Sequence, residues 1–481
     1  MLARQTVVYF AANVFSAIFG LINTIVFTRV FAVAAYGDYL LGFAFATLLA
    51  TFLASALKLA ILREQAKGEG DDIRGVILAA MALLAPAAPL FFMAARLTGL
   101  SSPVAAAAVL LAFAITLYET SQESLRAAQR PVDYLRGTVY RALFVSALGV
   151  AVALASASGA ALLASSSAAL VAATALFWRA AWGDAKPKLD RARLLDIAKA
   201  GLPFTFSMSL MALATVADRF LLAELAGVAD AGRYGASLDL VRQALIIPAI
   251  SVSTAFVPMA VRLFAERGEA DTRRHLAKSV ELLLAVALPA CVGFALVSPQ
   301  IADLVLGPEF RETGRWAMPV LAMAVVFQIL TQQYLHTSFL LSNRNRFYLV
   351  NTGSILVFNL IVSALLIYRF GLAGAVWGRL AAEIFGCAQA YALSRVAFAM
   401  PLPLGRLALV GAATAAMAFA VHGLSADAAT LPPALALVLL VGAGVAVYAP
   451  IALALDLAEL RGLFGGLVRR RGARACQSPI A

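Results

Sequence analysis

Residues 6–28 read TVVYFAANVFSAIFGLINTIVFT, and no charged residue interrupts this apolar stretch. A helix needs about 20 predominantly apolar residues to cross the hydrocarbon core of a bilayer, so the stretch predicts a membrane span. The apolar core of a secretory signal is only about 7–15 residues long. We therefore expect a first membrane span here rather than a cleaved leader.

Stretches of the same kind recur along the whole chain. Its composition is 62% hydrophobic and 13% charged, against roughly a quarter charged in soluble domains. The stretches are continuous and rich in Ala and Leu instead of alternating like β-barrel strands, so they predict helices. We expect an all-α polytopic membrane protein with about 14 spans of this length. The expected spans are 6–28, 38–61, 75–96, 103–122, 137–156, 160–181, 201–223, 235–260, 277–298, 316–341, 347–368, 371–394, 405–424 and 434–456.

The distribution of basic residues predicts the orientation of these spans. With the N-terminus in the cytoplasm, most of the 38 Lys and Arg residues fall in cytoplasmic loops or at the adjoining span ends. The outer loops would hold only Arg29, Arg96, Arg233, Arg311, Arg315 and Arg369. Loops rich in Lys and Arg stay on the cytoplasmic side, so we expect both termini to be cytoplasmic. The formal net charge of +12 then reflects orientation, and we expect no nucleic-acid partner.

A short pattern occurs twice in the chain. Arg29 is followed by Tyr36-Gly37, and Arg219 is followed by Tyr234-Gly235, each time between two apolar stretches. Two six-span lobes in the same orientation would produce such a repeat, which is typical of transporters with a substrate path between the repeats. The alternative is chance, because aromatic residues and Gly are common in membrane helices and at their ends.

A few ionisable residues fall within the expected spans. A charge at the bilayer centre costs about 2.5–3.5 kcal/mol on insertion scales, so such residues usually face a cavity or a partner. Asp239 and Arg242 are spaced i,i+3, and Arg379 and Glu383 are spaced i,i+4, so each pair can share one helix face. The candidate substrate-binding residues are Arg29, Arg219, Arg242 and Arg379, and the candidate partner or coupling carboxylates are Asp218, Asp239 and Glu383.

These charges allow two interpretations. The first is that they form self-neutralised pairs that hold helices together. The second is that they form a cationic surface in an aqueous cavity, where Arg would bind phosphate or pyrophosphate with bidentate geometry. The second interpretation implies an anionic cargo.

Nothing in the sequence predicts catalysis, a metal site or a cofactor. The His and Cys residues are scattered without ligand spacing, and we interpret Cys291, Cys387 and Cys476 as inert packing residues. No phosphate-binding loop is present, so transport would be passive or driven by a gradient. The outer loops are too short for the catalytic loop of a membrane glycosyltransferase or polymerase. We interpret Glu123, Arg126 and Arg130 as a solvated or headgroup-facing stripe.

Several motifs resemble one known family. Arg29 with Tyr36-Gly37, the stretch DRFLL at 218–222, the stretch GRY at 232–234 and the stretch GLAGA at 371–375 carry the resemblance. The chain resembles the polysaccharide-biosynthesis (O-antigen) flippases of the multidrug/oligosaccharidyl-lipid/polysaccharide exporter superfamily. The match in span layout covers almost the whole chain, and the motifs carry site residues over only for Asp218 and Arg219.

The resemblance implies a fold and a cargo. It implies six-helix lobes at 1–185 and 186–396 around a central cavity, and two peripheral helices with a basic cytoplasmic tail at 397–481. The cargo would be an undecaprenyl-pyrophosphate-linked oligosaccharide, such as an O-antigen or exopolysaccharide repeat unit. Alternating access would move it from the cytoplasmic to the periplasmic leaflet of a bacterial inner membrane. Membrane lipids would be the other partners, and H⁺ or Na⁺ would be the coupling ion.

Two relatives of the same superfamily remain as alternatives. A cation-coupled drug antiporter would be expected to carry buried acidic residues in its first lobe. Only Glu119, near the inner end of 103–122, approaches that description here. A peptidoglycan-precursor flippase is the second alternative, and its loss would be lethal through the cell wall.

Overall fold

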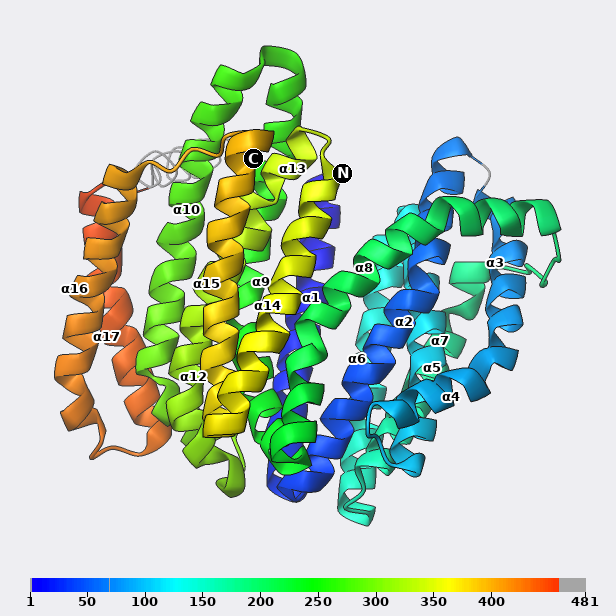
Figure 1. The fold of residues 1–481 in the computed structure, drawn as a ribbon, viewed down its shortest axis with the longest axis horizontal. Helices are drawn as coiled ribbons and strands as arrows, with labels where there is room; N and C mark the ends of the chain where they lie inside the picture. Colours follow the sequence, from blue (N-terminus) through cyan, green and yellow to red (C-terminus); the bar gives the residue numbers. More distant parts are fainter. Residues whose placement is uncertain (1, 69, 458–481) are drawn as a thin grey trace, which may run out of the picture. The chain divides into compact units, whose positions relative to one another are not determined.

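The computed structural model describes residues 2–68 and 70–457, and helices dominate throughout these residues (Figure 1). The helices of the first half are α1 (Leu2–Val30), α2 (Val33–Lys67), α3 (Gly70–Leu84), η1 (Ala85–Ala87), α4 (Ala88–Leu97), α5 (Ser102–Ala127), α6 (Pro131–Ala155), α7 (Gly159–Trp182) and α8 (Arg191–Ala226). Those of the second half are α9 (Val228–Arg267), α10 (Glu269–Leu296), α11 (Ser298–Val305), α12 (Pro308–Ile329), the π-helix η2 (Leu330–Leu335), α13 (Thr337–Leu341), α14 (Asn345–Phe370), α15 (Leu372–Ala397), α16 (Leu404–Ala428) and α17 (Pro433–Ala454).

The predicted multi-pass membrane architecture is confirmed. In the described part of the chain, 12 helical segments are long and apolar enough to cross a membrane. The first expected span falls on α1, whose described apolar part, Phe15–Val30, is shorter. The span expected at 371–394 is helical as α15, which carries Arg379 and Glu383 and is not among the 12. The count of about 14 spans stays a prediction.

Two further predictions concern the basic tail and the cysteines. The basic tail and Cys476 lie outside the described residues. Cys291 and Cys387 are free and buried in helices α10 and α15, as expected for packing residues.

The chain divides into two units by its internal contacts. The first unit comprises Met1–Ala236, Val305–Glu312 and Thr352–Gly378. Within it, α2 packs on α5 and α8, α7 packs on α5 and α6, and α1 packs on α6 (Figure 1). Small residues allow these close approaches, as is usual between membrane helices. On α5, for example, Ala105, Ala108 and Ala112 are fully buried.

The second unit comprises Ser237–Leu304, Thr313–Asn351 and Arg379–Ala481. Here α16 and α17 lie side by side and pack on α10 (Figure 1). Tyr448 of α17 donates a hydrogen bond of 2.7 Å to the carbonyl of Ala285, and Arg406 pairs with Glu281 at 2.7 Å. These contacts tie the last two described helices to α10. The lobe boundaries expected at 185 and 396 stay a prediction.

A close contact between two helix starts orders part of the first unit. Gly37 near the start of α2 faces Val228 at the start of α9, and a Cβ on Gly37 would come within 2.2 Å of the Val228 carbonyl oxygen. A Cβ on Gly232 would lie 2.8 Å from the carbonyl oxygen of Val33. Only glycine permits the two backbones to come so close. Both glycines belong to stretches that the sequence repeats or that resemble the flippase family.

Candidate functional site

The Asp218-Arg219 pair lies inside the first unit, near the end of α8. The exposed fractions are 0% for Asp218 and 4% for Arg219. The hydroxyl of Tyr234, which comes from α9, donates a hydrogen bond of 2.5 Å to Oδ2 of Asp218. Nη1 of Arg219 lies beside Gly235, 3.8 Å from the point where a Cβ would stand. The Tyr-Gly part of the repeated pattern therefore adjoins the buried charges, which need such polar contacts to be tolerated away from water.

Arg379 and Glu383 form a buried ion pair on α15 in the second unit. Nη2 of Arg379 lies 2.7 Å from Oε1 of Glu383, and the side chains are only 5% and 6% exposed. The i,i+4 pairing expected from the sequence is confirmed. A pair buried this deeply is strongly destabilised if one partner is removed, because the other charge remains out of water.

The remaining predicted residues are less buried. Asp239 and Arg242 lie on α9 in the second unit and are both half-buried, whereas Arg29 is exposed in the last turn of α1. Arg29 belongs to the first unit together with Asp218-Arg219. A role for these residues in cargo binding or ion coupling stays a prediction.

The first unit also contains a polar cavity of about 310 Å³. We call it the α5 pocket, because half of its lining residues come from α5 and the rest come from α1, α2 and α6. It is lined by Ser16, Lys58, Tyr118, Glu119, Gln122, Glu123, Arg126, Tyr134, Thr138 and Arg141.

Two ion pairs contribute to the wall of the α5 pocket. Nζ of Lys58 lies 2.6 Å from Oε2 of Glu119 and so joins α2 to α5. Nη2 of Arg126 lies 2.8 Å from Oε1 of Glu123, whose side chain is 10% exposed. Both acidic residues of the pocket therefore have a cationic partner.

Arg141 on α6 supplies a third cation to the α5 pocket. Its Nη2 donates a hydrogen bond of 2.5 Å to the hydroxyl of Ser16, and its guanidinium carbon lies 5.4 Å from the centre of the Tyr118 ring. Among the residues whose side chains the structure describes, its contacts include no carboxylate. The pocket consequently carries one more positive than negative charge.

The α5 pocket corrects one interpretation of the sequence. Glu123 and Arg126 were expected on a solvated stripe with Arg130, but Glu123 is buried and both residues line the pocket. In the sequence, the signal for the α5 pocket was that Lys58 and Arg141 lie close to the inner ends of apolar stretches. Such residues are hard to tell from ordinary loop cations, because only the packing of α2, α5 and α6 brings them together.

The second unit has a cavity of its own, of about 290 Å³. We call it the π-helix pocket, because Gln332 and Gln333 of η2 contribute to its lining. Ser253 of α9 donates a hydrogen bond of 2.7 Å to Oε1 of Gln333. Nε2 of His336 lies 2.9 Å from Oδ1 of Asn351. Single π-helical turns often mark functional sites, but this lining has no carboxylate, Lys or Arg.

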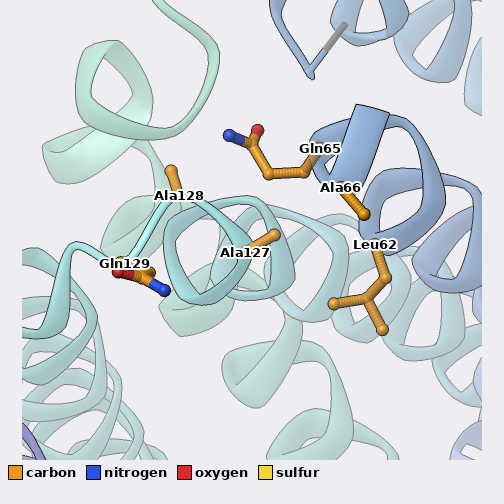
Figure 2. Close-up of a pocket in the computed structure, with 6 residues that line it drawn as sticks. All are labelled: Leu62, Gln65, Ala66, Ala127, Ala128 and Gln129. Atoms are coloured by element: carbon orange, nitrogen blue, oxygen red, sulfur yellow. The ribbon is translucent and has the colours of Figure 1, made fainter. Parts of the chain in front are cut away.

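A third cavity, of about 420 Å³, lies between the ends of α2 and α5 (Figure 2). It is lined by Leu62, Gln65, Ala66, Ala127, Ala128 and Gln129. With two amides as its only polar side chains, it offers no charge to an ionic ligand. In the part of the chain that the structure describes, no group of His, Cys, Asp and Glu could hold a metal ion.

Several solved membrane proteins have folds similar to that of this chain. A lipid II flippase, MurJ, in an inward closed conformation has a TM-score of 0.77 at 13% identity, covering 95% of this chain and all of its own. An inward-facing multidrug resistance MATE transporter has a TM-score of 0.66 at 16% identity, covering 79% of this chain and 94% of its own. A transporter of the superfamily from Pyrococcus furiosus has a TM-score of 0.53 at 17% identity, covering 82% and 92%. Identities this low show the fold alone.

Sequence comparison identifies the family. No curated protein matches the chain. The sequence pattern of the family described as "Polysaccharide biosynthesis protein" matches residues 2–264, more than half of the chain. The family resemblance drawn from the motifs is thereby confirmed. The chain belongs to the polysaccharide biosynthesis protein family and has the fold of the multidrug/oligosaccharidyl-lipid/polysaccharide exporter superfamily.

Proposed function

We propose that this chain flips an undecaprenyl-pyrophosphate-linked oligosaccharide, such as an O-antigen or exopolysaccharide repeat unit, across a bacterial inner membrane. The observation that carries the proposal is the family match over 2–264. Arginines buried in membrane helices support it, because Arg219 and Arg379 are each 4% exposed. Charges kept in such positions usually mark a substrate or ion pathway.

The proposed transport works by alternating access of two six-helix lobes, 1–185 and 186–396, with about 14 spans and both termini in the cytoplasm. The helices of 397–481 would lie at the periphery. Arg29, Arg219, Arg242 and Arg379 would contact the anionic cargo. Asp218, Asp239 and Glu383 would balance these charges or couple transport to H⁺ or Na⁺.

Deletion of the gene tests the cargo. We expect loss of surface polysaccharide and accumulation of the lipid-linked precursor in the inner leaflet, both restored by the wild-type gene. An unchanged glycan with new drug sensitivity would instead identify a drug antiporter. Lethality through the cell wall would identify a peptidoglycan-precursor flippase, an alternative that the fold likeness to a lipid II flippase keeps open.

The cationic-cavity part of the proposal has its own test. Arg242→Ala should abolish transport of the labelled precursor into reconstituted vesicles without lowering the amount of protein in the membrane. Arg267→Ala, at the exposed end of the same helix, is the matched control and should transport normally. Full activity of both Arg242→Ala and Arg242→Lys would contradict a role for this charge.

A further inference from the structure

The turns that follow α5 and α13 share one backbone conformation and one pattern of hydrogen bonds to a neighbouring helix. Gln129 and Asn343 both have a left-handed backbone, with φ of 53° and 52°. The next residue in each case is an arginine whose Nη1 donates to a backbone carbonyl near the end of another helix. Arg130 does so at 2.8 Å at the end of α7, and Arg344 does so at 3.0 Å at the end of α15.

In both units a serine before the turn also donates a hydrogen bond to a backbone carbonyl near the end of the same neighbouring helix. Ser124 donates a hydrogen bond of 2.9 Å to the carbonyl of Ala181, and Ser338 donates one of 2.7 Å to the carbonyl of Phe398. Each serine precedes its left-handed residue by the same number of positions. The two units therefore contain one structural motif at a constant spacing along the chain, and this motif relates the α5 pocket to the π-helix pocket.

The equivalent pockets differ in charge. Applying the same spacing to the lining of the α5 pocket pairs Glu119, Glu123 and Arg126 with Gln333, Thr337 and Leu340, which line the π-helix pocket. It pairs Arg141 with Ile355, which does not line that pocket. Of the two aromatic residues that line the α5 pocket, only Tyr134 is paired with another aromatic residue, Tyr348, which lines the π-helix pocket. Three of the five charged residues of the α5 pocket thus have neutral counterparts that line the π-helix pocket, and that lining contains no Asp, Glu, Lys or Arg.

Two contacts that join neighbouring helices also differ in charge between the two units. In the first unit, the ion pair of Lys58 with Glu119 joins α2 to α5 at 2.6 Å. In the second unit, a neutral hydrogen bond from Ser253 to Gln333 joins α9 to η2 at 2.7 Å. At Gln333, the position that the spacing pairs with Glu119, the link to a neighbouring helix is therefore neutral, although its partner Ser253 is not the position that the spacing pairs with Lys58. Partly buried charges are costly in a membrane protein, so their retention in one pocket alone points to a ligand.

The chemistry of the α5 pocket defines the class of that ligand. Arg141 contributes the excess positive charge and suits a phosphate group, which the guanidinium fork binds through two hydrogen bonds. The hydroxyls and amides around it suit a ligand rich in hydroxyls. Nε2 of Gln122 donates to the Tyr118 hydroxyl at 2.6 Å, whereas its buried Oε1 has no hydrogen-bond partner among the described residues. A cavity of about 310 Å³ is at the lower end of the range for small-molecule sites.

We propose that the α5 pocket binds a phosphorylated sugar, with Arg141 on the phosphate and with Glu119 and Gln122 on the sugar hydroxyls, and that the π-helix pocket does not. This inference rests on the proposed function, because the phosphorylated sugar would be the head of the lipid-linked cargo. The inference adds to the proposed function a binding site that is present in one unit only. None of the seven site residues predicted from the sequence lines this site.

Binding of glucose 1-phosphate to the purified full-length protein tests the proposal without requiring transport. In nanodiscs of zwitterionic lipid, equilibrium dialysis should show saturable binding that inorganic phosphate displaces. Arg141→Gln should weaken this binding about tenfold or more, since it removes charge-assisted hydrogen bonds. Arg141→Lys should weaken it less. Gln333→Ala, which alters the equivalent wall of the π-helix pocket, is the matched control and should bind normally.

Each contrary result overturns the proposal. Absence of saturable binding below about 10 mM would exclude the site. So would equal affinities of the wild type and Arg141→Gln. If anionic lipid in the nanodisc abolishes the binding, the pocket holds a lipid headgroup phosphate and does not recognise sugar. Retained binding in a protein that flips no lipid-linked oligosaccharide would contradict the proposed function and leave the pocket assignment standing.

Discussion

At the scale of single residues, burial separates charges that the sequence grouped together. Arg29, Arg242 and Arg379 were all predicted cargo contacts, yet the first is exposed, the second is half-buried and only the third is fully buried. Arg379 also has a carboxylate partner, Glu383, within 2.7 Å. A buried pair can hold a helix bundle together or can open to bind cargo, and substitution of both partners separates these roles.

Arg379→Met combined with Glu383→Leu replaces the ion pair by apolar groups of similar size. We expect the double variant to reach the membrane in normal amounts, because replacing a buried pair is often neutral, and to lose transport. Arg379→Met alone should be destabilised by about 3–5 kcal/mol, because Glu383 then loses this partner. Quantitative immunoblotting measures the amount of each variant in the membrane, and vesicle assays measure its transport. Full transport by the double variant would assign the pair to folding alone.

The hydrogen bond from Tyr234 to Asp218 can be tested by a single substitution. Tyr234→Phe removes the donor from a buried carboxylate and should lower the free energy of unfolding by about 1.5–3 kcal/mol. The thermal midpoint in detergent measures the change. Tyr368→Phe is the control and should leave the midpoint unaltered, because Tyr368 is 83% exposed. Equal midpoints for the wild type and Tyr234→Phe would show that the hydrogen bond contributes nothing.

At the scale of helices, small residues decide which elements meet. The starts of α2 and α9 touch because Gly37 and Gly232 have no side chain to hold the backbones apart. This contact holds Tyr234 where it can reach Asp218 across α8 and α9.

Gly37→Ala should loosen the junction of α2 with α9, since the added Cβ would lie 2.2 Å from the Val228 carbonyl oxygen. Overpacking of this kind costs about 1–3 kcal/mol or more. We expect a lower thermal midpoint and a faster hydrogen exchange at the starts of both helices. Gly411→Ala, in open space within α16, should be neutral or slightly stabilising. An unchanged Gly37→Ala protein would mean that the contact is not maintained in the membrane.

At the scale of the whole molecule, the prediction is the orientation of the helices in the membrane. The 14 expected spans alternate in direction, and the basic loops should lie in the cytoplasm. In a cysteine-free background, Asp184→Cys, in the exposed connection after α7, should react with a membrane-impermeant maleimide only after the cells are opened. Ala157→Cys and Thr430→Cys, in exposed connections at the other ends of the helices, should react in intact cells. The reverse labelling would contradict cytoplasmic termini.

Hydrophobic length and loop charge, which are properties of contiguous segments, are enough to predict a helical multi-pass membrane protein without tertiary information. The ion pair on α15 was also predictable, because residues at i and i+4 share a helix face wherever the helix lies. The α5 pocket was not predictable. Lys58, Glu119 and Arg141 come from three different helices, and only the packing of those helices makes neighbours of them. Burial likewise depends on tertiary structure, since the same apolar surroundings in the sequence leave Arg29 exposed and enclose Arg219.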